Sequence, residues 1–259
     1  MMDSIKLDLQ TEAARGAEAS IVFARNPVLI NWFLSDEKDP ALGTFLKEIM
    51  EDLASRKGFT TSFAANVRTG NYYDKGSYLN KLTKEDPDDS WFFDSLSAKE
   101  EVLLNVDYNA KLKTTNLWFN AQIRYQGSVI GIAGVGISIT DVINQFKEAI
   151  PSKNSIIFLV DQENHIYVSS LENDEKTRIE DFISGDVKQV KGYDTLSYFV
   201  HNNDKYVVSR TQIGTSNYGI MVVMPIKDFV PTFWELNALG RIYFCNYCYS
   251  PFTWDLGSS

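Results

Sequence analysis

Cysteine is almost missing from this chain of 259 residues, and the two that occur, Cys245 and Cys248, both stand close to its end. The long cysteine-free body needs no disulfide framework. The C-x-x-C spacing also occurs in zinc sites and redox pairs, but one pair without a second is weak evidence for either. The tail that contains it, residues 237–259, shows no helix or strand period and ends in Gly-Ser-Ser. We therefore interpret this tail as partly appended sequence, outside the fold.

Long apolar runs and excess positive charge are also lacking. No stretch of 18 apolar residues occurs, so the chain contains no predicted membrane span. It shows no positively charged, apolar signal peptide either. The formal net charge of −9 argues against a nucleic-acid partner and against binding to an anionic membrane surface.

Signatures of catalysis are scarce. The chain has only two histidines, His165 and His201, and it lacks a G-x-S-x-G elbow, a P-loop and an H-E-x-x-H helix. The glycines of GIAGVG (131–136) stand inside an expected strand, so they form no dinucleotide fingerprint. We therefore predict no catalytic residue, no cofactor and no metal, and keep an enzyme with paired aspartates only as a minor alternative.

Helical periodicity dominates the first 58 residues. Apolar residues recur every four positions between residues 3 and 25, which predicts a long helix with one apolar stripe. Asn26-Pro27 and Asp39-Pro40 each place a capping side chain before a proline, which predicts two further helices. Gly58 suits the end of the last helix.

From residue 59 the period changes to two, with turn residues between the runs. A first unit has expected strands at 60–66, 102–106, 116–125 and 128–139, and a closing helix at 140–150. Residues 71–77 are expected to form a strand end and a turn with Lys75-Gly76 at the bend, and Gln126-Gly127 is the expected turn between the last two strands. A second unit has expected strands at 155–161, 165–170, 195–200, 205–212 and 218–225, a short helix near 174–184 and a last helix from 226. The fold class is therefore α+β, with a helical region (1–58), two antiparallel units (59–150 and 151–236) and the tail (237–259).

Acidic and aromatic residues meet in EDPDDSWFFDSL, residues 85–96. Asp86 suits an N-cap and Pro87 the first helical position. The acids that follow complement the positive end of a helix. The segment therefore predicts a short helix that carries Trp91, Phe92 and Phe93.

Several motifs follow one another in an order that is typical of one family: NPVLINWFL (26–34), NYYDKG (71–76), DPDDSWFFDSL (86–96), LNVDYN (104–109), LWFNAQI (117–123) and GIAGVGISI (131–139). From residue 3 to about 236 the chain resembles the double Cache sensor domain, which is built from two tandem PAS-like modules. This domain occurs in bacterial and archaeal histidine kinases, diguanylate cyclases and chemoreceptors.

The resemblance implies a membrane-distal module (59–150) and a membrane-proximal module (151–236), each with an antiparallel sheet. In such receptors flanking membrane spans hold the domain outside the cell membrane, so we expect a periplasmic or extracellular location, with the spans outside this sequence. The expected function is that of a ligand-binding sensor in a transmembrane receptor, with a histidine kinase favoured as the parent protein. The domain itself is not expected to be an enzyme.

The resemblance also places a ligand between the distal sheet and the short helix over it. Amino-acid-binding members carry an arginine two residues before the tryptophan of that helix and an aspartate in the glycine-rich strand. Asp89 and Gly136 take these positions here, so an amino acid is not the expected ligand. The residues expected to line the site are Tyr72, Tyr73, Asp89, Trp91, Phe93, Asp107, Tyr108, Trp118, Asn120 and Gly136.

Two kinds of ligand remain open. If Asp89 and Asp107 face the site, a cationic amine over aromatic rings is favoured. If only Asn120, Asp107 and tyrosine hydroxyls do, a small neutral polar molecule fits equally, because a buried acid or amide needs a partner. The alternative function is a module of the same fold without a small ligand, which forms a homodimer through the apolar stripe of its N-terminal helix.

Overall fold

The computed structural model describes residues 2–56, 58–109, 114–150, 152–171, 178–179, 195–201, 203–214 and 216–228. It begins with three helices: α1 (Met2–Ala24), α2 (Pro27–Leu34) and α3 (Pro40–Ser55). The predicted caps are confirmed. The Asn26 side chain accepts a hydrogen bond from the Val28 N–H, and the Asp39 side chain accepts from Ala41 and Leu42. Each cap satisfies a backbone donor that a helix start leaves unpaired.

A first antiparallel sheet follows, with strand order β3-β2-β1-β6-β5-β4. Its strands are β1 (Thr61–Asn66), β2 (Asn71–Asp74), β3 (Ser77–Lys81), β4 (Val102–Asn109), β5 (Thr114–Tyr125) and β6 (Ser128–Ser138). A 3₁₀ turn at Pro87–Asp89 leads into α4 (Ser90–Ser97) between β3 and β4. The sequence predicted a turn at Lys75-Gly76 but missed β3, which is exposed along its whole length and so lacks an apolar alternation.

A second antiparallel sheet has the order β8-β7-β11-β10-β9. Helix α5 (Ile139–Ala149) leads into it. Its strands are β7 (Ile156–Asp161), β8 (Ile166–Ser169), β9 (Thr195–His201), β10 (Asp204–Gln212) and β11 (Tyr218–Pro225). The α+β class and the two predicted sheets are confirmed, whereas the boundaries at 59, 150 and 236 stay a prediction.

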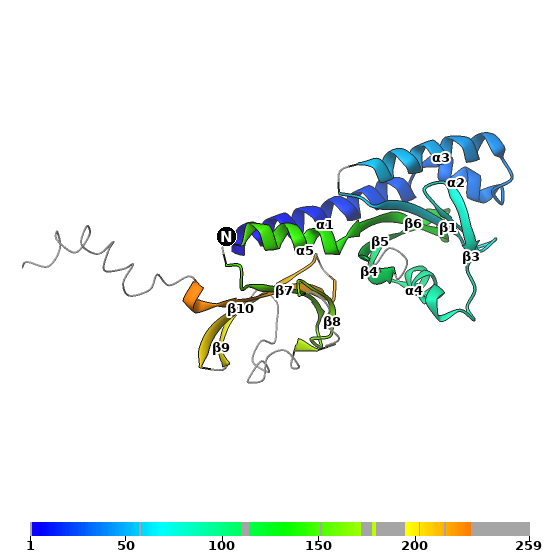
Figure 1. Cartoon of the computed structure of the whole chain (residues 1–259). Helices are drawn as coiled ribbons and strands as arrows, with labels where there is room; N and C mark the ends of the chain where they lie inside the picture. Colours follow the sequence, from blue (N-terminus) through cyan, green and yellow to red (C-terminus); the bar gives the residue numbers. More distant parts are fainter. Residues whose placement is uncertain are drawn as a thin grey trace, which may run out of the picture.

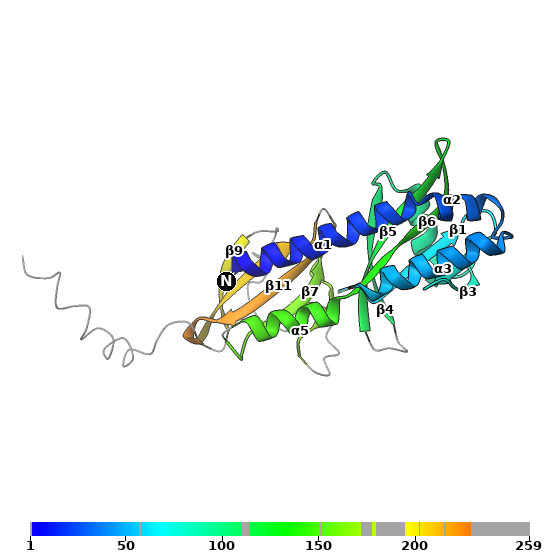
Figure 2. The same cartoon turned by 90° about the horizontal axis from the view of Figure 1, so that it is seen from above.

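Helix α1 runs along both sheets and joins them (Figure 1). Seen from above, α1 and α5 lie side by side over the second sheet, and α1 continues over the first sheet next to α3 (Figure 2). One continuous apolar core connects the two sheets, from Leu9 and Phe119 to Ile157 and Met224. Among the described residues no helix is long and apolar enough to cross a membrane.

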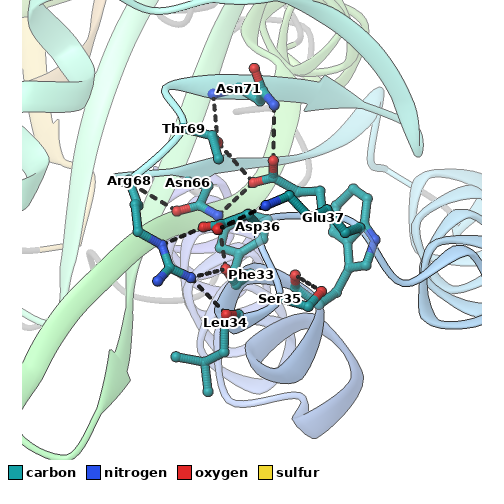
Figure 3. Close-up of polar contacts among 11 residues, drawn as sticks. Phe33, Leu34, Ser35, Asp36, Glu37, Asn66, Arg68, Thr69 and Asn71 are labelled. Carbon is teal, nitrogen blue, oxygen red and sulfur yellow. Dashed lines mark hydrogen bonds and ion pairs between the residues drawn. The ribbon is translucent and has the colours of Figure 1, made fainter.

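A polar cluster fixes the helical region to the first sheet (Figure 3). Asp36 and Glu37, after α2, both adopt positive φ angles of 55° and 58°, a conformation that is rare outside glycine. The Glu37 carboxylate accepts hydrogen bonds from Asn66, from the Thr69 hydroxyl (2.9 Å) and from Asn71 (2.8 Å). These three donors come from the end of β1, the β1–β2 turn and the start of β2, so the cluster compensates the strained turn by holding it against the sheet.

Three predicted features lie outside the described residues. These are most of the short helix near 174–184, the last helix beyond residue 228 and the tail at 237–259.

Candidate functional site

The two faces of the first sheet carry different side chains. One face packs under α1, α2 and α3 through Ala64, Phe119 and Val135. The other carries an aromatic cluster under α4. Cross-strand pairing decides which residues share this second face, because directly opposed residues point to the same side. We call it the aromatic face and define it by Phe63, Tyr72, Trp91, Trp118, Asn116 and Asn120.

Phe63 lies at the centre of the aromatic face. Its ring centroid is 5.7 Å from that of Trp91, 5.4 Å from Trp118 and 6.2 Å from Tyr72, each in an edge-on arrangement. Edge-to-face contacts at these distances are favourable for aromatic rings. Helix α4 brings Trp91, and strands β1, β2 and β5 bring the other three.

Glycines on β6 make room for these rings. Gly136 pairs with Trp118, and a Cβ at Gly136 would meet the Trp118 ring at 3.1 Å. Gly134 pairs with Asn120, and a Cβ there would stand 1.8 Å from the Phe119 carbonyl oxygen. Both glycines therefore serve close packing over the strand.

Both ends of α4 are anchored to the sheet or its loops. At the N-terminal end Asp86 accepts from the Asp88 N–H (3.0 Å), and buried Asp89 accepts from the Thr83 N–H (2.7 Å). At the C-terminal end Gln122 of β5 donates to the carbonyls of Ser95 (2.8 Å) and Ala98 (3.1 Å). Asp89 thus has a structural task, and the aromatic helix is held over the face at both ends.

Asn120 is one of two asparagines on the aromatic face that carry buried, unpaired polar atoms. Asn120 is 1% exposed, and among the described residues neither its amide nitrogen nor its amide oxygen has a hydrogen-bond partner. Asn116 lies on the same face of β5, on the far side of Trp118. Its side-chain oxygen is also buried and unpaired. A buried amide without partners costs about 1–3 kcal/mol. In the part of the chain that the structure describes, no hydrogen bond offsets this cost at Asn120.

Negative charge gathers around the Tyr72 hydroxyl. Burial raises the pKa of Tyr72, and the carboxylates of Asp74 and then Asp107 raise it further. Asp74 accepts a hydrogen bond from Thr61, on the neighbouring strand. Asp107 stands at the exposed end of β4, opposite Asn116. The Tyr72 hydroxyl is therefore neutral and able to donate a hydrogen bond at any physiological pH.

The structure brings together most, but not all, of the expected site residues. Tyr72, Trp91, Trp118, Asn120 and Gly136 meet on the aromatic face, and Phe93 packs at its edge with Lys84 over its ring at 5.6 Å. The structure places Tyr73 away from this face, contrary to expectation. It pairs with Ala64 on the opposite face and packs edge-on against Trp32 at 4.7 Å. Asp89 is engaged by Thr83, as described above, and the side chain of Tyr108 lies outside what the structure describes.

Sequence reasoning missed four residues of this region: Phe63, Asp74, Asn116 and Gln122. A strict alternation would have found three of them, Asp74, Asn116 and Gln122, because residues 116, 118, 120 and 122 share one side of β5 and residues 72 and 74 share one side of β2. The same rule would have separated Tyr73 from Tyr72. Among the described residues no group of three or more His, Cys, Asp or Glu side chains is arranged to hold a metal ion.

Comparison with solved structures identifies the fold. The ligand-binding domain of the chemoreceptor CtaA from Pseudomonas fluorescens, in complex with L-isoleucine, is 17% identical and has a TM-score of 0.63, covering 88% of this chain and 90% of its own. The ligand-binding domain of the amino-acid chemoreceptor PctC from Pseudomonas aeruginosa, in complex with GABA, is 12% identical with a TM-score of 0.62, covering 86% and 96%. A domain from Vibrio parahaemolyticus, described as part of a sensory box/GGDEF protein, is 11% identical with a TM-score of 0.66, covering 86% and 92%.

No protein-family model matches the chain. The likeness to the solved structures nevertheless extends over both sheets and the long helix, since each match covers at least 86% of the chain. The chain therefore has the double Cache fold of sensory ligand-binding domains, as the order of its motifs predicted.

Proposed function

We propose that this protein is an extracytoplasmic sensor domain that binds a small polar molecule at the aromatic face of its distal module. The observation that carries the proposal is the Asn120 amide, buried at 1% exposure with both polar atoms unpaired. A side chain that destabilises the fold in this way has a use if a ligand completes its hydrogen bonds. The role is one of binding, not of catalysis.

Binding requires a movement of the aromatic face. Both polar atoms of Asn120 are shielded from solvent here, so at least one covering ring has to move before a ligand reaches the amide. Trp91 is the candidate for this movement, because it stands on α4 rather than on the sheet and is only partly buried. A ligand that binds only the open arrangement shifts the population towards it, which is what a sensor needs.

The polar groups of the face restrict the ligand. Asn120 offers an NH2 donor group and a carbonyl acceptor, Asn116 an unpaired side-chain carbonyl oxygen and Tyr72 a neutral hydroxyl. By the family resemblance, Asp89 and Gly136 take the positions at which amino-acid sensors carry their two charged ligand contacts. These groups suit a small neutral polar molecule or a cationic amine over aromatic rings, rather than a zwitterionic amino acid.

The parent protein, in this proposal, is a membrane-anchored receptor with a histidine kinase as its favoured output. The support is the fold, which the chain shares with ligand-binding domains of chemoreceptors, and the long helix α1, which reaches from one sheet to the other. Flanking spans outside this sequence would place the domain in the periplasm or outside the cell.

A thermal-shift screen tests the proposed binding. We expect one class among small amines, neutral polar metabolites and amino acids to raise the melting temperature by roughly 5–10 °C at a concentration of about 100 times its dissociation constant. The rise in melting temperature should be smallest for amino acids. If no compound stabilises the wild type, while a control sensor responds in the same plate, the proposed function is wrong.

A second candidate function is homodimerisation without a ligand. It is favoured by an open groove of about 790 Å³ between α1 and α3, with Val22 on its wall 66% exposed. Arg15 and Arg56 line the groove together with Glu18 and Glu48. A second copy related by a two-fold axis could place its acidic side chains against the basic ones, because such an interface is self-complementary.

Replacing Val22 by glutamate tests the dimer. If the groove is the interface, Val22→Glu should lower the association constant at least tenfold, because it introduces charge into an apolar contact. Sedimentation velocity over a concentration series would measure this. Val67→Glu, a partly exposed apolar residue outside the groove (42% exposed), is the control. A wild type that stays monomeric at high concentration excludes this candidate.

A further inference from the structure

Three amide side chains and one ring follow one another along the aromatic face of β5. Asn116, Trp118, Asn120 and Gln122 share this face because every second residue of a strand points to the same side. Each of the three amide residues is at most 5% exposed. A buried amide normally finds its partners within the protein, so an amide that lacks them calls for another explanation.

The Gln122 amide serves the fold. Its nitrogen donates to the carbonyls of Ser95 (2.8 Å) and Ala98 (3.1 Å) at the end of α4. Its oxygen accepts a hydrogen bond from Arg124. Both sides of this amide are therefore engaged by the protein, and the side chain fixes α4 to the sheet.

The two asparagines flank Trp118 and differ from Gln122. Among the described residues, both polar side-chain atoms of Asn120 and the side-chain oxygen of Asn116 lack a hydrogen-bond partner. The Trp118 ring between them is only partly buried, and it stands edge-on to Phe63 with the centroids 5.4 Å apart. The face therefore presents two unsatisfied polar groups with an apolar ring between them.

The spacing of the two polar groups follows from the strand. Asn116 and Asn120 both lie on β5, four residues apart, which corresponds to about 13 Å along a strand. A hydrogen bond joins atoms that are about 2.9 Å apart. A molecule that lies over Trp118 and bonds to both asparagines therefore needs polar atoms about 7 Å apart or somewhat further.

The amide atoms also set the chemistry of each end. Asn120 offers a donor and an acceptor, whereas the unpaired atom of Asn116 is an acceptor. Asp107 stands opposite Asn116 in the register, which disfavours a carboxylate at that end. A hydroxyl or an ammonium group can donate to either asparagine.

We infer that the ligand of the aromatic face is an elongated molecule with an apolar middle and a hydrogen-bond donor at each end, such as a diol, an amino alcohol or a diamine. Its two ends bind Asn116 and Asn120, and its middle lies against the Trp118 ring. This inference rests on the proposed function and names the class of ligand for the same site.

A series of linear diols tests the length of the ligand. In NMR titrations we expect the dissociation constant to fall from ethanediol to pentanediol and hexanediol, because only the longer diols span both asparagines. Hexanol has the same chain as hexanediol but one hydroxyl, and it should bind about tenfold more weakly, the equivalent of one hydrogen bond. Aminohexanol and diaminohexane distinguish a hydroxyl from an ammonium end, and hydroxyhexanoate should bind less tightly than hexanediol.

Asn116→Leu removes one of the two polar ends. It should weaken the binding of hexanediol about tenfold and leave the binding of hexanol, which keeps Asn120, nearly unchanged. Asn31→Leu is the matched control, because Asn31 is exposed on α2, which covers the opposite face of the sheet. This control should bind both compounds as the wild type does.

Two outcomes overturn the inference. One is an Asn116→Leu variant that binds hexanediol as tightly as the wild type; the other is equal affinity of the wild type for hexanol and hexanediol. If the thermal-shift screen nevertheless finds a ligand that requires Asn120, the proposed function stands without this inference. If no compound of either set binds, the proposed function is wrong and the inference falls with it.

Discussion

Replacing Asn120 by leucine should make the protein more stable and unable to respond to its ligand. The substitution removes a buried amide whose two polar atoms have no partner and keeps a similar volume. We expect the free energy of unfolding to rise by about 1–2 kcal/mol. Chemical denaturation measures the stability, and the thermal-shift response to a compound that stabilises the wild type should vanish.

Asn66 provides a matched control for Asn120. It is the same residue type on the same sheet, also 1% exposed, but its amide donates to the Phe33 carbonyl (3.1 Å) and to Glu37, and its oxygen accepts from the Arg68 N–H (2.9 Å). Asn66→Leu should therefore lower the free energy of unfolding, by about 3 kcal/mol. If both substitutions destabilise the protein alike, Asn120 is an ordinary buried amide and the binding proposal loses its main support.

Gly134→Ala should have the largest effect on stability of the substitutions considered. The new Cβ would stand 1.8 Å from the Phe119 carbonyl oxygen and 3.0 Å from the Phe63 ring. Because the nearest atom belongs to the backbone of the neighbouring strand, β5 or β6 has to shift. We expect a loss of about 3 kcal/mol or more in the free energy of unfolding, measured by chemical denaturation.

Gly136→Ala is the control that distinguishes this clash from a general intolerance of β6 to any added side chain. The nearest atoms that a Cβ at Gly136 would meet belong to the side chains of Thr61 and Trp118, each at 3.1 Å, and these can yield by a few tenths of an ångström. We expect a loss below about 1 kcal/mol. Equal losses in the two variants would contradict the packing described for this strand.

Helix starts, turns and strand alternation could be predicted from the sequence because they depend on neighbouring residues. Asn26-Pro27 and Asp39-Pro40 start helices as expected. Lys75-Gly76 and Gln126-Gly127 adopt the positive φ angles of tight turns. Trp118 and Asn120 share one side of β5, as the period of two requires. Strand β3 was missed because its five residues are all exposed and owe their conformation to pairing with β2.

The partners of the polar side chains could not be predicted, because they come from distant parts of the chain. Nothing local distinguishes Asp89, which a loop N–H engages, from a carboxylate that faces a ligand. Likewise, Asn66 and Asn120 stand in similar strands, but only Asn66 finds partners, from a strained turn about 30 residues earlier in the chain.

The most direct test of the central claim is a crystal structure of the protein purified in its native state and never refolded. Our account predicts electron density for a small molecule between the Trp91 and Trp118 rings, with a polar atom within hydrogen-bond distance of the Asn120 amide. A structure in which the same rings are closed and well ordered over an unpaired Asn120, with and without soaked amines and neutral polar compounds, would contradict it.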